Sequence, residues 1–242
     1  FLPGDVSVTT GPSGAPVAAP YEPETLHSLE LGSKNRFLEN RLQLNGDVFY
    51  YRYGGYQAAV EIGQSPIPGG PTYYATLGSP ARMLGAELEV TYLPTTDDRF
   101  GLSVSYDDGY YLDKPAAFAA GITNSHFSSV IPWNIDPSYS HTFHLPGGQV
   151  MTLLGEALYH SSYLVTELSN VCANGICHDY RGVEPYLENG NTLVGNFTLT
   201  WNFVPQASLS AYVRNVSDVR YKNRAMLNSA TPSANSADLS AP

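Results

Sequence analysis

Apolar and polar residues alternate one by one through long stretches of this chain. In the segment 41–55, one set of alternate positions is apolar (Leu42, Leu44, Val48 and Tyr50) and the other is polar (Gln43, Asn45 and Asp47). Successive side chains of a strand point to opposite faces, so this pattern predicts a strand with one apolar and one polar face. Eight such segments occur, near residues 25–36, 41–55, 82–94, 99–112, 138–146, 149–165, 191–204 and 207–221. Because none of them has a helical period, we predict an all-β fold.

The predicted connections between these segments alternate between short and long. The short ones cover residues 37–40, 93–98, 145–148 and 204–206, and the long ones cover about 56–81, 113–137 and 166–190. In an antiparallel sheet, this alternation places every long loop at one end of the strands and every tight turn at the other. Outer-membrane barrels have this asymmetry, with short periplasmic turns and long outer loops.

The length of the strands also fits a membrane barrel. Residues 41–53 would extend about 43 Å at about 3.3 Å per residue, which spans an apolar band of about 25 Å even at a tilt of about 40°. We therefore predict an antiparallel transmembrane β-barrel, with lipid on the apolar face and the lumen on the polar face. A soluble β-sandwich would show the same alternation and is the alternative. Aromatic residues near strand ends favour the barrel, where they form interfacial girdles: Tyr50, Tyr92, Tyr106, Trp201 and Phe203.

Composition narrows the possible classes of protein. The 242 residues include 22 Asp and Glu but only 12 Lys and Arg, which gives a net charge of -10. Nucleic acid is therefore not an expected partner, because phosphate binding needs clustered basic side chains. The chain lacks an apolar run of about eighteen residues or more, which excludes a helical membrane protein. Residues 1–25 lack the basic and apolar segments of a secretory signal and are typical of a loop, so we expect a mature piece or a fragment.

Two cysteines lie close together in a polar stretch. Cys172 and Cys177 bracket the residues "ANGI", and Asn-Gly favours a turn. We predict a local disulfide between them, which implies an oxidising compartment. A metal site is the weaker alternative, because a second pair of thiols at a suitable spacing is lacking and His178 alone does not complete a tetrahedral site.

Three stretches carry a family resemblance in the order in which they occur. They read "YEPETLHSLELGSKNRFLENRLQLNGDVFYYRYGGYQ", "GAELEVTYLPTTDDRFGLSVSY" and "LSAYVRNVSDVRYKN". Together they resemble the barrel domain of TonB-dependent outer-membrane receptors, over about 200 residues. The matching positions are Pro23, Glu24, Thr25, Glu30, Leu31, Gly32, Lys34, Arg41, Leu42, Phe49, Tyr50, Tyr53, Asn215, Val216, Ser217, Asp218 and Tyr221.

This resemblance implies a larger assembly than the chain itself. Family members have a barrel of twenty-two strands and an amino-terminal plug domain, and they dock an energy-coupling complex that contains TonB. Residues 1–242, with about eight strands, would be the carboxy-terminal part of that barrel, with the plug and the last strand absent. The resemblance implies a receptor in the bacterial outer membrane, surrounded by lipid, for energised uptake of a small molecule or chelate. Siderophores, cobalamin, haem and oligosaccharides are all ligands within the family.

Aromatic and imidazole side chains near the long-loop end are the candidates for ligand contact. They are Tyr110, Tyr111, Trp133, His160 and Tyr163. Aromatic faces suit sugars, chelates and corrinoids by stacking. The alternative is that each of these residues belongs to an interfacial girdle or packs a loop.

Other polar clusters give no catalytic, cofactor or metal site. His141 and His144 are three residues apart, which puts them on opposite faces of a strand. Glu87 and Glu89 share a face, as expected of a polar lumen wall. The acidic residues Asp107, Asp108 and Asp113 depart from the spacing of a calcium loop.

Two other classes of function stay open at this stage. One is a complete eight-stranded outer-membrane barrel that acts as an enzyme or an adhesin, because eight strands suffice for a small barrel. The other is a secreted β domain that binds carbohydrate.

Overall fold

The computed structural model of this protein describes most of the predicted strands in full. The main chain is described for residues 7–10, 16–19, 23–64, 72–112, 126–165, 172–173, 176–177, 188–222, 224–227 and 237–240. Side chains are described for residues 23–57, 78–112, 126–165 and 188–222. Within this described part, the only helix is a single 3₁₀ turn, η1 (Pro146–Gly148). None of the helical structure described is long and apolar enough to cross a membrane.

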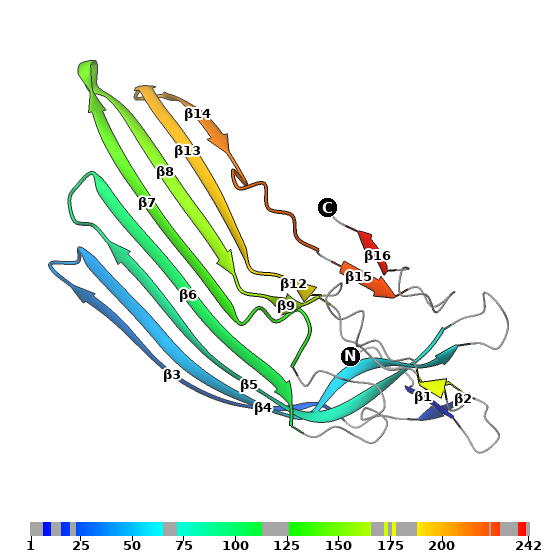
Figure 1. The fold of residues 1–242 in the computed structure, drawn as a ribbon. Coiled ribbons are helices and arrows are strands. Elements are labelled where there is room, and N and C mark those ends of the chain that lie inside the picture. The colour runs from blue at the N-terminus through cyan, green and yellow to red at the C-terminus, as the bar shows by residue number, and fades with distance from the viewer. Residues whose placement is uncertain are drawn as a thin grey trace.

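Eight antiparallel strands form one curved sheet (Figure 1). They are β3 (Thr25–Phe37), β4 (Leu42–Gln64), β5 (Thr72–Tyr92), β6 (Asp98–Tyr111), β7 (Trp133–Leu145), β8 (Gln149–His160), β13 (Thr192–Val204) and β14 (Ala207–Val213). Each strand pairs with the next of these eight in sequence, which makes a simple meander. The edge strands β3 and β14 do not pair with each other, so the sheet is open. The eight predicted strand segments are confirmed.

Four two-stranded sheets accompany the large sheet. β1 (Ser7–Thr10) pairs with β2 (Pro16–Ala19), β9 (Tyr163–Leu164) with β12 (Glu188–Asn189), β10 (Cys172–Ala173) with β11 (Ile176–Cys177), and β15 (Arg224–Leu227) with β16 (Ala237–Ser240). The register of β10 and β11 places Cys172 opposite Cys177. The side chains of these cysteines lie outside the described part, so their disulfide stays a prediction.

All four tight turns lie at the same end of the sheet, as the sequence predicts (Figure 1). The turn from β3 to β4 has three successive residues with positive φ, Leu38, Glu39 and Asn40, and the amide of Arg41 donates to the carbonyl of Leu38 at 3.1 Å. The turn from β7 to β8 uses Gly147 at φ 80°. Glycine adopts this left-handed conformation without steric cost.

Several boundaries predicted from the sequence are wrong. Strand β14 ends at Val213 and not near residue 221, and β8 ends at His160 and not near residue 165. Residues 56–64 and 72–81 do not form a loop, because β4 and β5 continue to pair as far as Gln64 and Thr72. The register shifts between Tyr53 and Tyr56, which marks a bulge. The alternation of apolar and polar residues is lost at this bulge, but the two strands stay paired beyond it. Strand β7 begins at Trp133, five residues earlier than predicted, so Trp133 belongs to a strand and not to a loop.

One face of the sheet is apolar and carries aromatic side chains at both ends of the strands. Those near the tight turns are Phe37, Tyr92, Phe100, Tyr139, Phe143, Trp201 and Phe203, and those toward the long loops are Tyr50, Tyr106, Tyr110, Trp133 and Tyr159. On β7, Trp133 and Phe143 are ten residues apart, which is about 33 Å along the strand and about 25 Å in height at a tilt of about 40°. This height matches the apolar band of an outer-membrane barrel.

The strand pairs are staggered across the sheet. Phe37, the last residue of β3, connects through successive cross-strand partners to Phe197 of β13. Phe197 lies seven residues before Val204, where β13 ends. If the tight turns lie at one level, this stagger of about one residue per strand tilts the strands by about 40° from the barrel axis, as in closed barrels.

Candidate functional site

The other face of the sheet is polar and contains a hollow of about 310 Å³. Its polar lining comes from four neighbouring strands: Gln43, Asn45, Glu89, Thr91, Ser103, Asp136 and Ser138. The amide of Asn45 donates to the carboxylate of Glu89 at 3.4 Å. The Oδ1 atom of Asp136 is buried, and within the described part of the chain it accepts no hydrogen bond. The hollow is therefore lined by carboxylate, amide and hydroxyl groups, which can accept hydrogen bonds from a ligand that carries hydroxyl or amide donors.

Cross-strand hydrogen bonds hold the polar face together on either side of this hollow. The hydroxyl of Tyr51 donates to Glu30 at 2.7 Å, from β4 to β3. The amide of Asn134 donates to the hydroxyl of Ser105 at 3.1 Å, from β7 to β6. These contacts fix the side chains of the wall before any ligand arrives.

An aromatic cluster covers the wall near the long-loop end. The ring of Tyr56 stacks on Phe127 with centroids 4.5 Å apart, and Tyr111 meets Phe127 edge-on at 5.0 Å. Phe127 packs directly over Gly109, where a Cβ atom would lie only 2.5 Å from its ring. The amide of Phe127 also donates to the carbonyl of Gly109 at 2.9 Å. Phe127 is thereby held against the sheet.

The two predicted contact residues in β6 lie on opposite faces of the sheet. Tyr111 is 3% exposed and belongs to the aromatic cluster on the polar face. Tyr110 pairs with Arg82 on the apolar face, and the guanidinium of Arg82 lies over its ring, 4.1 Å from the centroid. His126 is 6.0 Å from the same ring. For both tyrosines, the geometry favours the packing alternative over direct ligand contact.

Trp133 lies on the apolar face, where it contacts Tyr106 with ring centroids 4.8 Å apart. Both side chains stand at the long-loop end of the apolar band. This position favours the girdle alternative for Trp133.

His160 and Tyr163 are the two remaining predicted contact residues. His160 ends β8 on the polar face, opposite Asn134 on one side and Thr192 on the other, and is half-buried. The hydroxyl of Tyr163 accepts a hydrogen bond from the amide of Asn189 at 2.9 Å. The five predicted residues therefore do not form one site, and their contact with a ligand stays a prediction.

The remaining polar clusters have separate partners. His141 contacts Asp98 at 2.7 Å and His144 contacts Asp97 at 2.8 Å, so the two imidazoles lie on opposite faces as predicted. Glu87 and Glu89 stand on the polar face. In the part of the chain that is described, no group of three metal-ligating side chains gathers in one place. Asp113 lies outside the described residues.

Asp136 is the residue of the polar hollow that the sequence prediction missed. It falls in the segment 113–137 that was predicted to be a loop, although the alternation of Trp133, Ile135 and Pro137 already continues the pattern of β7. The strand was not predicted here because of Pro137, since proline removes a hydrogen-bond donor from the ladder and is unusual in a central strand. The ladder between β7 and β8 indeed skips Asp136 and Pro137.

Comparison with known proteins supports this architecture. Residues 3–216 match the family described as "TonB dependent receptor-like, beta-barrel". The chain belongs to this family. The family is one of transport receptors and not of enzymes. No curated protein matches the chain.

Three solved structures share the fold of this chain, although their sequence identity to it is low. The ferric yersiniabactin uptake receptor FyuA from Yersinia pestis has a TM-score of 0.63 and 14% identity, over 91% of this chain and 29% of its own. The ferric-catecholate import receptor Fiu from K12 E. coli has a TM-score of 0.57 and 15% identity, over 84% of this chain and 25% of its own. The copper transporter OprC has a TM-score of 0.56 and 14% identity, over 83% of this chain and 27% of its own. The chain thus spans less than a third of each of these receptors.

Proposed function

We propose that this chain forms part of the barrel wall of an outer-membrane receptor that imports a scarce ligand with energy delivered through TonB. Residues 1–242 are the carboxy-terminal portion of that barrel, and a plug domain fills the lumen in the whole protein. The support is the two-faced meander, which has its tight turns at one end and an apolar band of about 25 Å on one face. The protein is located in the bacterial outer membrane, with lipid around this band.

The mechanism makes and breaks no bond in the ligand. The ligand enters from the long-loop end and binds to the polar face, where the carboxylates of Glu89 and Asp136 line the hollow and accept hydrogen bonds from the ligand. His160 stands on the same face at the rim and contributes a further donor or acceptor. Rearrangement of the plug then opens the path along the wall.

The ligand class is a metal chelate such as a siderophore. The support is that the names of the three similar structures all concern metal uptake: ferric yersiniabactin, ferric catecholate and copper. Chelates of this kind carry hydroxyl or amide groups that match the acceptors of the polar hollow.

Uptake by the full-length receptor tests the proposal. Deletion of the gene is expected to abolish growth on one chelate as the only iron or copper source, and the receptor is expected in the outer-membrane fraction. The substitution Asp136→Asn should weaken binding of that chelate about tenfold, since a hydrogen bond to a charged group contributes about 1.5 kcal/mol. Asp97→Asn, in a tight turn, is the matched control and should leave binding unchanged. A deletion strain that takes up every chelate tested at the normal rate would refute the proposal.

We also propose that Cys172 and Cys177 form a disulfide at the long-loop end. The support is the register of β10 and β11, which opposes the two residues, together with the oxidising compartment that an outer-membrane location implies. Alkylation of the unreduced, denatured receptor should leave both cysteines unmodified, and alkylation after reduction should modify both. Modification without reduction would contradict the proposal.

A further inference from the structure

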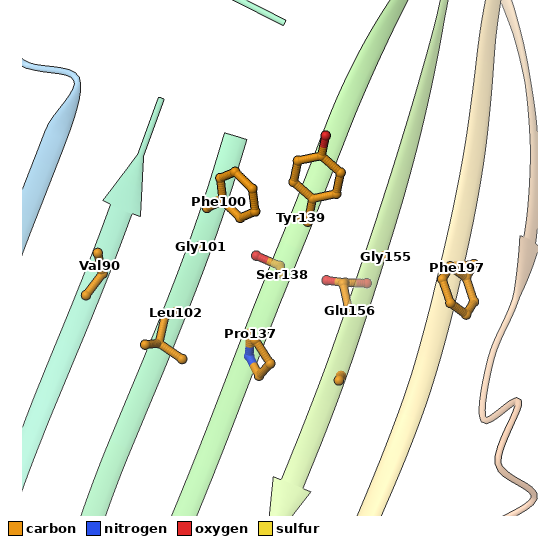
Figure 2. A pocket seen from close by; sticks show the side chains of 11 residues that line it. Val90, Phe100, Gly101, Leu102, Pro137, Ser138, Tyr139, Gly155, Glu156 and Phe197 are labelled. Carbon is orange, nitrogen blue, oxygen red and sulfur yellow. The ribbon is translucent and has the colours of Figure 1, made fainter. Parts of the chain in front are cut away.

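The apolar face of the sheet has a groove between β6 and β13 (Figure 2). The groove has a volume of about 590 Å³. Gly155 and Ala157 of β8 form its floor, and Val90, Phe100, Leu102, Pro137, Tyr139 and Phe197 form its sides. Most of this face carries bulky side chains, so the groove arises because two successive apolar-face positions of β8 are small.

A carboxylate, that of Asp98, contacts a residue at the end of the groove nearest the tight turns. The ring of Tyr139 lines the groove, and its hydroxyl, which points toward the turn end in Figure 2, donates to Asp98 Oδ1 at 2.6 Å. Thr95 donates to Asp98 Oδ2 at 2.5 Å. The ring of His141 contacts Oδ1 at 2.7 Å. The side chain of Asp98 keeps 20% of its surface exposed, so it is open to a further partner.

Charge decides what this end of the groove attracts. None of the residues that line the groove is Lys or Arg, and of the three partners of Asp98 only His141, at 2.7 Å, is a side chain that can carry a positive charge. Arg99 follows Asp98 directly but points to the opposite face, since neighbouring residues of a strand alternate. The groove therefore combines an apolar trough with a negative end, which complements an acyl chain joined to a cationic group.

We propose that the groove binds a phospholipid of the periplasmic leaflet, with an acyl chain along Gly155 and Ala157 and an ethanolamine ammonium group at Asp98. This inference rests on the proposed outer-membrane location, because the apolar face meets lipid only there. Tight turns face the periplasm in such barrels, so Asp98 lies at the headgroup level of the inner leaflet. The lipid is held at a defined place on the wall, in contrast to the exchanging lipids over the bulky remainder of the face.

Native mass spectrometry of the full-length receptor tests this site. The receptor is delipidated in detergent and mixed with phosphatidylethanolamine or phosphatidylglycerol at equal concentrations. The receptor should retain one phosphatidylethanolamine, with about fivefold preference over phosphatidylglycerol, as expected for one partly exposed ion pair. Ala157→Leu fills the groove and should reduce retention of both lipids about tenfold. Ala86→Leu is the matched control on the same face outside the groove, and should behave as the unmodified receptor.

Asp98→Asn separates the headgroup contact from the acyl contact. It should keep retention of lipid but bring the ratio between the two lipids close to one. Equal retention in the Ala157→Leu and Ala86→Leu variants, or a preference for phosphatidylglycerol, would overturn the proposal. Loss of a receptor dimer in Ala157→Leu, with no lipid bound to any variant, would show that a second copy covers the groove and would also overturn it.

The outcome of the lipid-retention experiment is independent of ligand uptake by the receptor. A receptor that takes up its ligand but retains no lipid refutes this site and leaves the proposed function standing. A receptor absent from the outer-membrane fraction refutes the proposed function first.

Discussion

The contact between Phe49 and Gly85 allows a sharp test of how the polar face is packed. Phe49 is 8% exposed although it stands on the polar face of β4. Its ring lies directly over Gly85 of β5, and two of its carbon atoms are 2.7 Å from the place where a Cβ at Gly85 would be. Tyr51 stacks on the same ring with centroids 4.9 Å apart. The ring can occupy this place only because residue 85 has no side chain.

Two single substitutions should destabilise the receptor for different reasons. Gly85→Ala forces the ring of Phe49 out of its place, which costs about 1–3 kcal/mol, as overpacking does in other proteins. Phe49→Ala removes a buried aromatic ring and costs about 3 kcal/mol, at the lower end for such deletions because the lumen side can rehydrate. The double variant relieves the clash, so the effects should be non-additive, and the double variant should unfold with a free energy close to that of Phe49→Ala alone.

The assay is urea unfolding of the full-length receptor in lipid vesicles, followed by tryptophan fluorescence and by heat-modifiable migration on gels. Gly46→Ala serves as the control glycine on the other face of β4, where a Cβ would meet the carbonyl of Glu87 at 3.3 Å. Whatever its size, its effect should add to that of Phe49→Ala, because the two side chains stand on opposite faces of β4. If Gly85→Ala and Phe49→Ala are also additive, the ring of Phe49 does not depend on the missing side chain, and the reasoning fails.

Three further outcomes follow from described contacts. Gly109→Ala should displace the ring of Phe127, which a Cβ would approach to 2.5 Å, and should speed limited proteolysis after β6; unchanged cleavage would contradict this. Asn189→Ala should lower the free energy of unfolding by about 1–3 kcal/mol, because it leaves the amide and carbonyl of Lys222 without the partners they have at 2.7 and 2.6 Å; equal urea midpoints would show that water replaces it. Trp133→Ala should leave ligand affinity within about twofold, since this ring lies on the apolar face; a larger loss in a binding titration would restore it as a ligand contact.

The strands could be predicted from the sequence because the alternation of side chains and the pairing of strands have the same physical cause. Leu42 and Gln43 fall on opposite faces in any strand, so their alternation indicates both the strand and its two environments. The tight turns could be predicted for the same reason, as the places where the alternation stops.

The candidate site was harder to predict, because it depends on which strands are neighbours. Phe49 interrupts the polar set of β4, and only the position of Gly85 on the next strand explains its burial. The bulge at Tyr53 to Tyr56 breaks the alternation without ending the strand, so the sequence pattern suggested a loop. Tyr110 and Tyr111 are adjacent in sequence and were grouped together, but their side chains lie on opposite faces of β6.

The stagger of the strands changes how the path of a ligand should be mapped. At an inclination of about 40°, ten residues along one strand rise about 25 Å through the membrane and also travel about 21 Å around the wall. The polar side chains of a single strand therefore trace part of a spiral and do not form a vertical ladder. Residues directly above or below Asp136 along the pore axis must therefore be sought on neighbouring strands. A series of substitutions along one strand would move around the circumference of the pore almost as far as it moves along the axis.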